Sequence, residues 1–147
     1  MNPTDLTQRP PRSPRTRLGG FVILPRMLDK GRATIAGTPG EYKYACPLDQ
    51  RFLDFAGIDP DALKQHLTEG KGDGEILAWV LETSKTKPNE IAIAAWSHFA
   101  ERRVPADVES RGFFNEMQSK IAPKREDIVT WFDMLDVDDY VSFGGKP

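Results

Sequence analysis

Apolar residues recur at intervals of three and four along most of this chain, and prolines, glycines and aspartates separate the periodic stretches. This period places the apolar side chains on one face of an α-helix. The pattern occurs in residues 24–36, 48–56, 63–67, 76–81, 89–103, 114–121 and 128–135. It predicts an all-α, mostly helical fold of about six or seven helices with little or no sheet.

Proline and aspartate mark where several of these helices begin. Pro25 suits the first turn of a helix, where its missing N–H costs nothing. Asp59 followed by Pro60 combines a capping residue with a proline at the first helical position. Asp73 and Asp107 are predicted to cap two later helices.

Residues 89–103 form the most apolar of the helical stretches. Their apolar side chains cover more than half of the helix circumference, which is typical of a central, buried helix. The last helix is expected to place four side chains inward, those of Ile128, Val129, Phe132 and Leu135. Residues 41–46 alternate between polar and apolar positions, as a short strand or an extended loop would.

The charge of the 147-residue chain is −2 overall but is unevenly distributed. Residues 1–32 contain seven basic and two acidic residues, so the remainder is strongly acidic. Residues 1–17 are also rich in proline and are predicted to form an extended arm, which precedes a single helical domain, residues 18–147. Either the arm is a flexible terminus, or it is clamped across the acidic remainder of the chain.

A convergent set of cations is the leading candidate for a site. It consists of Arg12 and Arg15 from the arm, with Arg26, Lys30 and Arg32 from the first helix. Guanidinium groups bind carboxylate and phosphate in bidentate geometry, so we expect a module that binds a small anionic ligand. The opposing interpretation places Arg26 and Lys30 on a solvated face, or pairs them with Asp49, Asp54 or the acidic residues near the C-terminus.

Four further side chains near the predicted anion site are candidates for binding or catalysis, namely Tyr42, Tyr44, Cys46 and Asp49. The tyrosines suit stacking or hydrogen bonding with a ligand. An enzyme of unknown reaction is the second hypothesis, using either Cys46 before a helix N-terminus or the carboxylate pair Asp49 and Asp54. Self-association or partner binding through the arm and residues 140–143 is the third.

Composition excludes several other classes of protein. One cysteine rules out an internal disulfide and a multi-cysteine zinc site. His66 with Glu69 and His98 with Glu101 have metal-ligand spacing, but we expect structural histidines and neither a metal nor a cofactor. Short apolar runs and the absence of a signal peptide indicate a soluble, cytoplasmic protein. The acidic body argues against nucleic acid as a partner.

Several short motifs of the chain occur together in one known family. They are RPPRSPR at 9–15, LGG at 18–20, LPRMLDK at 24–30, GEY at 40–42, CPLD at 46–49, GID at 57–59 and WV at 79–80. In these motifs the chain resembles the family called domain of unknown function 5069, most densely over its first sixty residues. The resemblance implies a bacterial, single-domain protein, and it implies no particular activity, cofactor or catalytic residue.

Overall fold

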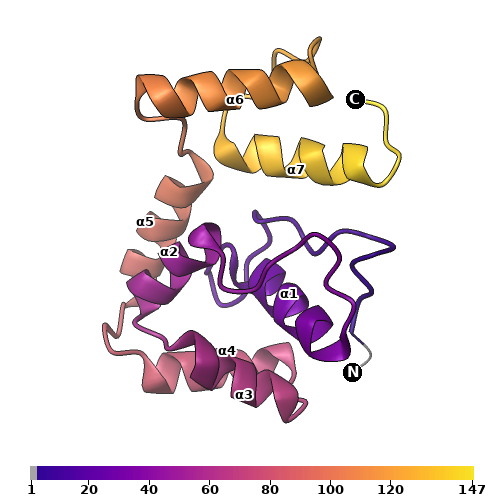
Figure 1. The fold of residues 1–147 in the computed structure, drawn as a ribbon. Coiled ribbons are helices and arrows are strands. Elements are labelled where there is room, and N and C mark those ends of the chain that lie inside the picture. The colour runs from indigo at the N-terminus through magenta and orange to yellow at the C-terminus, as the bar shows by residue number, and fades with distance from the viewer. Residues whose placement is uncertain (1–2) are drawn as a thin grey trace. The chain divides into compact units, whose positions relative to one another are not determined.

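The computed structural model describes residues 3–147 (Figure 1). The predicted all-α class is confirmed, because this range contains seven helices and no strand. The helices are α1 (Leu24–Ala36), α2 (Pro47–Ala56), α3 (Pro60–Thr68), α4 (Asp73–Thr83), α5 (Glu90–Glu101), α6 (Val108–Ile121) and α7 (Trp131–Ser142). None of the helices in the described range is long and apolar enough to cross a membrane. The chain forms two compact units, Met1–Ser97 and His98–Pro147.

The helix ends follow the local signals in the sequence. Pro25 lies in the first turn of α1, and Gly37 ends that helix with a left-handed backbone, at φ 79°. Asp59 caps α3 as predicted, because its side chain accepts a hydrogen bond from the backbone N–H of Ala62. Asp73 is the first residue of α4 rather than its cap, which is Gly72. The carboxylate of Asp73 therefore remains available to other partners.

Helix α1 occupies the middle of the first unit, where it packs against α2 and α3. The approach of α3 depends on Gly31, because a Cβ atom there would lie 2.6 Å from the Leu67 side chain. The same Cβ would lie 3.1 Å from the ring of Tyr44. In the sequence, Gly31 lies on the apolar face of this helix and predicts the close approach of a neighbouring helix, and the contact with Leu67 of α3 confirms that prediction.

A tight turn before α1 brings the chain into the core of the first unit. Leu18 and Phe21 exchange two backbone hydrogen bonds across this turn. Ser97 of α5 fixes it, donating to the carbonyl of Gly20 at 2.6 Å and accepting from the N–H of Val22 at 3.2 Å. The turn positions Phe21 in an aromatic cluster, together with Phe52, Phe55 and Trp96.

Helix α5 is not the buried central helix that its composition indicates. Ile91 is 80% exposed and Phe99 is 61% exposed. Only a narrow stripe of α5 is buried, at Ile93, Ser97 and Ala100. Because neighbouring segments cover α5 along one line only, its wide apolar arc does not correspond to burial on all sides.

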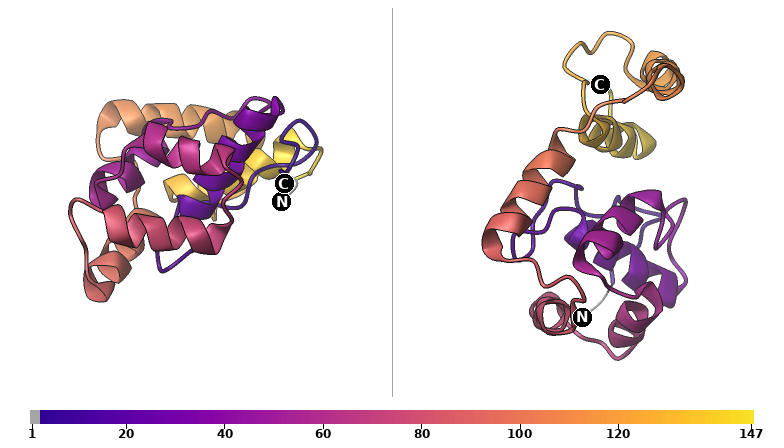
Figure 2. Two further views of the ribbon diagram at one scale, coloured as in Figure 1. Left: turned by 90° about the horizontal axis from the view of Figure 1, so that it is seen from below. Right: turned by 90° about the vertical axis from the view of Figure 1, so that its left-hand side faces the viewer.

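The second unit is built around α6 and α7, which lie side by side in both Figure 1 and Figure 2. Phe114 of α6 and Met134 of α7 belong to its core, and Trp131 packs edge-on against Phe114 at 5.2 Å. Ile128 is buried as predicted, but the expectation for Val129 is wrong, since it is 52% exposed. Both residues precede α7, so helical spacing does not govern which way they face.

We expect Gly31→Ala to lower the free energy of unfolding by about 1–3 kcal/mol, because the added methyl group overpacks the contact with Leu67 and Tyr44. This loss opposes the better helix propensity of alanine. Urea unfolding measures the difference. Gly74→Ala in α4 is the matched control, since nothing lies within 4 Å of a Cβ there, and it should leave stability unchanged or slightly raised. Equal stabilities of the two variants would contradict the close packing.

Candidate functional site

The arm lies against the body of the first unit over residues 3–17. Leu6 is buried, and its N–H donates to the carbonyl of Thr38 at 3.0 Å. Gly40 allows this approach, because a Cβ atom there would lie 2.6 Å from the Leu6 carbonyl oxygen. Further along, the Pro14 carbonyl accepts a hydrogen bond from the N–H of Ile23 at 3.0 Å. Of the two interpretations of the arm, the structure shows the clamped one.

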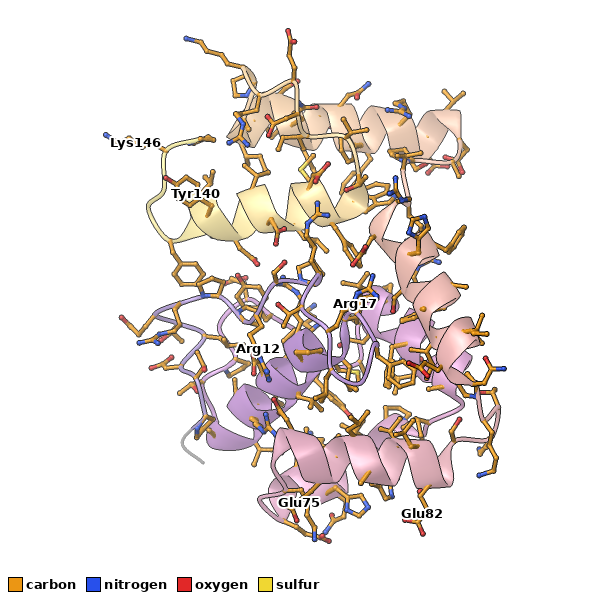
Figure 3. All side chains as sticks on the ribbon, turned by 180° about the vertical axis from the view of Figure 1, so that it is seen from behind. Arg12, Arg17, Glu75, Glu82, Tyr140 and Lys146 are labelled. Carbon is orange, nitrogen blue, oxygen red and sulfur yellow. The ribbon has the colours of Figure 1, made fainter. Side chains whose placement is uncertain are left out.

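Arg12 attaches the arm to two helices and is labelled in Figure 3. Its guanidinium donates two hydrogen bonds to Asp29 of α1, from Nε to Oδ2 at 3.0 Å and from Nη2 to Oδ1 at 2.9 Å. The backbone N–H of Arg12 also donates to Asp29 Oδ2 at 2.9 Å. The remaining Nη1 donates to Asp73 of α4 at 2.8 Å. Arg12 is therefore held by carboxylates of the chain itself.

Arg32 reaches the same Asp73 carboxylate from α1. Its Nη1 donates to Asp73 Oδ1 at 2.7 Å, and its Nη2 donates to the carbonyl of Lys71 at 3.1 Å. Burial alone would raise the pKa of Asp73, but hydrogen bonds and charges from Arg12 and Arg32 outweigh it and hold that pKa below its ordinary value of 3.8. Asp73 is thus a charged partner shared by two arginines.

Arg26 lies inside the fold rather than on a solvated face. Only 3% of its surface is exposed, and Nη1 donates to the backbone carbonyl of Arg12 at 3.2 Å. Its guanidinium carbon lies 5.4 Å from the centre of the Tyr42 ring, a cation–π arrangement. Arg15 is exposed, and its backbone N–H donates to Ser13. Arg26 is thus joined to Arg12, and Arg12 is joined to Arg32 through Asp73.

Lys30 and Asp49 form a buried ion pair between α1 and α2. Lys30 is 3% exposed, and Asp49 is fully buried. The Lys30 ammonium donates to Asp49 Oδ1 at 3.0 Å and also to Cys46 Sγ at 3.2 Å. Oδ2 lies 2.9 Å from Nζ, but it is a buried oxygen without a well-aligned donor. Of the two alternatives to an anion site, the solvated face is wrong for Lys30, and its pairing with Asp49 is confirmed.

The buried position of Asp49 disfavours the charged form of its carboxyl group. Burial raises the pKa of its carboxyl, and the Lys30 ammonium and the backbone of Ala45 and Cys46 oppose this rise. Asp54, the predicted acid–base partner of Asp49, is exposed on α2. The two carboxylates thus occupy different environments on one helix.

Tyr44 has a packing role beside this ion pair. Its hydroxyl donates to the carbonyl of Pro60 at 2.7 Å, and its ring lies against Gly31. Burial, with the negative charge of Asp49, raises the pKa of the Tyr44 hydroxyl. Tyr44 therefore links α1 to the start of α3 as a neutral phenol.

A small groove of about 280 Å³ lies beside α1 in the first unit. Its lining, which we call the Arg32 groove, is Pro3, Arg32, Ile35, Ala36, Leu67, Thr68, Gly70 and Lys71. Arg32 and Lys71 bring positive charge to an otherwise apolar and small-residue surface. Of the five predicted cations, only Arg32 lines this groove.

The two histidine pairs lie in different parts of the chain, with His66 on α3 and His98 on α5. His66 packs on Trp79 at 4.5 Å, and its Nδ1 lies 3.7 Å from Glu69 Oε2. His98 is exposed on α5. Across residues 3–147, no three side chains of histidine, cysteine, aspartate or glutamate are grouped so that they could hold a metal ion.

Sequence reasoning missed the carboxylates that neutralise the arginines. Asp73 was expected to cap a helix, and Asp29 was not assigned a partner. These residues lie 61 and 17 positions from Arg12 in the sequence. The only signal that could have found them is the split between a basic start and an acidic remainder, which favours ion pairs between the two.

The Asp73 carboxylate should make the stability of the first unit depend on acid. Because its pKa is lowered in the folded state, its contribution is present above pH 3.8 and is lost as the pH falls through the folded value. We expect Asp73→Asn to be less stable at neutral pH and to lose less stability on acidification than the unaltered protein. Urea unfolding from about pH 6 to about pH 3 tests this. Asp54→Asn, at an exposed site on α2, is the control for the loss of one carboxylate, and a pH curve for Asp73→Asn identical to that of the unaltered protein would contradict this account.

The Lys30–Asp49 pair should show the asymmetry of a buried salt bridge. Lys30→Met leaves an uncompensated buried carboxylate and should cost about 3–5 kcal/mol of unfolding free energy. Adding Asp49→Leu removes that charge, so the double variant should recover most of the loss. Chemical denaturation of both variants gives the comparison. A double variant no more stable than Lys30→Met would contradict this account of the pair.

Comparison with known proteins adds a family but no activity. Residues 8–141 match the family described as Domain of unknown function (DUF5069). No curated protein matches the chain. The matched range includes both the Arg12 and Arg32 contacts with Asp73 and the contact between Lys30 and Asp49.

Proposed function

This chain belongs to the family of the domain of unknown function DUF5069, and from the placement of its cations we propose that it binds a small anionic ligand in the Arg32 groove. The observation that carries the proposal is the presence of Arg32 and Lys71 on one small, mostly apolar concavity. Arg12, Arg26 and Lys30 contact partners within the fold and do not line the groove.

Arg32 is held in a fixed position without being fully used. Asp73 and the Lys71 carbonyl occupy two of its five N–H donors. A guanidinium fixed in this way loses little side-chain freedom when an anion arrives, which favours binding. The Lys71 side chain, which is 41% exposed, adds an ammonium group, and its pairing with Glu75 at 3.8 Å is weak.

The remaining lining indicates the chemical class of the ligand. Ile35, Ala36 and Leu67 offer apolar contact beside the two cations. The groove is slightly smaller than the roughly 300 Å³ at which typical small-molecule sites begin. This combination suits a compact metabolite with one phosphate or carboxylate group and a short apolar body.

We expect Lys71→Ala to weaken binding of a short alkyl phosphate by about tenfold, since a charge-assisted hydrogen bond is lost. Titration calorimetry with butyl phosphate, repeated with inorganic phosphate, measures the change and the value of the apolar contact. Lys120→Ala is the matched control, because Lys120 is also an exposed lysine paired with a glutamate four residues away. Absence of binding to the unaltered protein, or equal weakening by both variants, would refute the proposal.

Catalysis by Cys46 is the second candidate function, favoured by the contact of its sulfur with the Lys30 ammonium. Cysteine sulfur serves as the nucleophile in covalent catalysis, and here an amine nitrogen lies 3.2 Å from it. Cys46→Ser separates the two functions, since it should leave phosphate binding unchanged and abolish any turnover that depends on the thiol.

A further inference from the structure

The contact between Lys30 and Cys46 has no role in the proposed anion site. Lys30 reaches the sulfur from α1, and Cys46 is the residue that immediately precedes α2. The nitrogen and the sulfur are 3.2 Å apart. Neither atom lies in the Arg32 groove.

The two partners differ in their access to solvent. Lys30 is buried, so its amine has little freedom to leave the sulfur. Cys46 is only partly buried, so the residue is less shielded from solvent than Lys30. An amine that is held beside a thiol is positioned to react with the oxidised form of that thiol.

Asp49 completes the arrangement on the other side of the nitrogen. Its fully buried carboxylate is directed at Nζ, and Oδ2 has no well-aligned donor. A lysine amine reacts only after it has lost a proton, and Asp49 is placed to accept that proton.

We propose that Lys30 and Cys46 are the site of an oxidative modification, in which hydrogen peroxide joins Nζ and Sγ through one oxygen atom as an N–O–S bridge. The separation of 3.2 Å leaves room for an oxygen between the two atoms with little movement of α1 or α2. A direct N–S bond would require a much larger approach of two elements that are packed together.

The reaction balances with two molecules of peroxide. In the first step the sulfur attacks one peroxide, the O–O bond breaks, and the products are a sulfenic acid and one water. In the second step the neutral amine and the sulfenic acid each give up one hydrogen, and the N–O bond forms. The second peroxide takes up both hydrogens and becomes two waters. The sulfur and the nitrogen each lose two electrons, and each peroxide gains two.

The unaltered full-length protein provides the direct test. After peroxide treatment, we expect the intact mass to rise by one oxygen less two hydrogens, with loss of tryptic cleavage after Lys30. Peptide mass spectrometry should locate the bridge between Lys30 and Cys46. Lys43 is an internal control, because it lies three residues from Cys46 in the sequence and is exposed.

Two variants complete the design. Cys46→Ser should show neither the mass change nor the loss of cleavage. Lys30→Arg keeps a cation opposite Asp49 but lacks a primary amine, so Cys46 should stop at the sulfenic acid, which dimedone traps. The proposal is overturned by a sulfinic acid with a free Lys30, by a disulfide between two copies of Cys46, by a bridge to Lys43, or by no reaction in the unaltered protein. A crosslink without the added oxygen would also overturn it, since N and S would then be bonded directly.

Discussion

Burial of cations on the polar side of α1 is the constraint that the first unit has to meet. Arg26 and Lys30 are almost completely removed from water. A charge in this position is costly unless opposite charges or hydrogen bonds compensate it. For Lys30 the compensation comes from Asp49 on α2, and for Arg26 it includes the backbone carbonyl of Arg12 in the arm. Because each partner belongs to a different segment, the contacts that compensate Lys30 and Arg26 also hold α2 and the arm against α1.

The arm and α1 each supply a guanidinium group that binds an acceptor on the other. The arm supplies the Arg12 guanidinium to Asp29, and the carbonyl of the same residue accepts a hydrogen bond from Arg26. Arg12 and Arg32 then share Asp73, which brings the first turn of α4 into the same network. Within residues 1–32, these cations therefore have partners inside the first unit, namely Arg12, Arg26, Lys30 and Arg32. Positive charge that a ligand could use is left at the rim of the Arg32 groove.

Sequence reasoning succeeded where the physical cause is local. Pro25, Asp59 and the glycine after α1 determine helix ends within a few residues, and Gly31 signals a close neighbour because only its missing side chain permits one. It failed where the cause is distant. Asp29 and Asp73 were not recognised as partners of Arg12 because they lie 17 and 61 positions from it, and the apolar arc of α5 gave no indication of which stripe would be covered.

The anion groove and the Lys30–Cys46 contact share one helix but are separate properties of it. Lys30 and Arg32 are two residues apart, so their side chains leave α1 in directions about 200° apart around the axis. Lys30 meets α2, whereas Arg32 meets the loop before α4. A ligand in the groove touches neither the sulfur nor Asp49, and a bridge at Lys30 removes no donor from Arg32. Any influence of one site on the other would have to pass through a shift of α1 itself, and the packing at Gly31 and the pairs with Asp29, Asp49 and Asp73 resist such a shift.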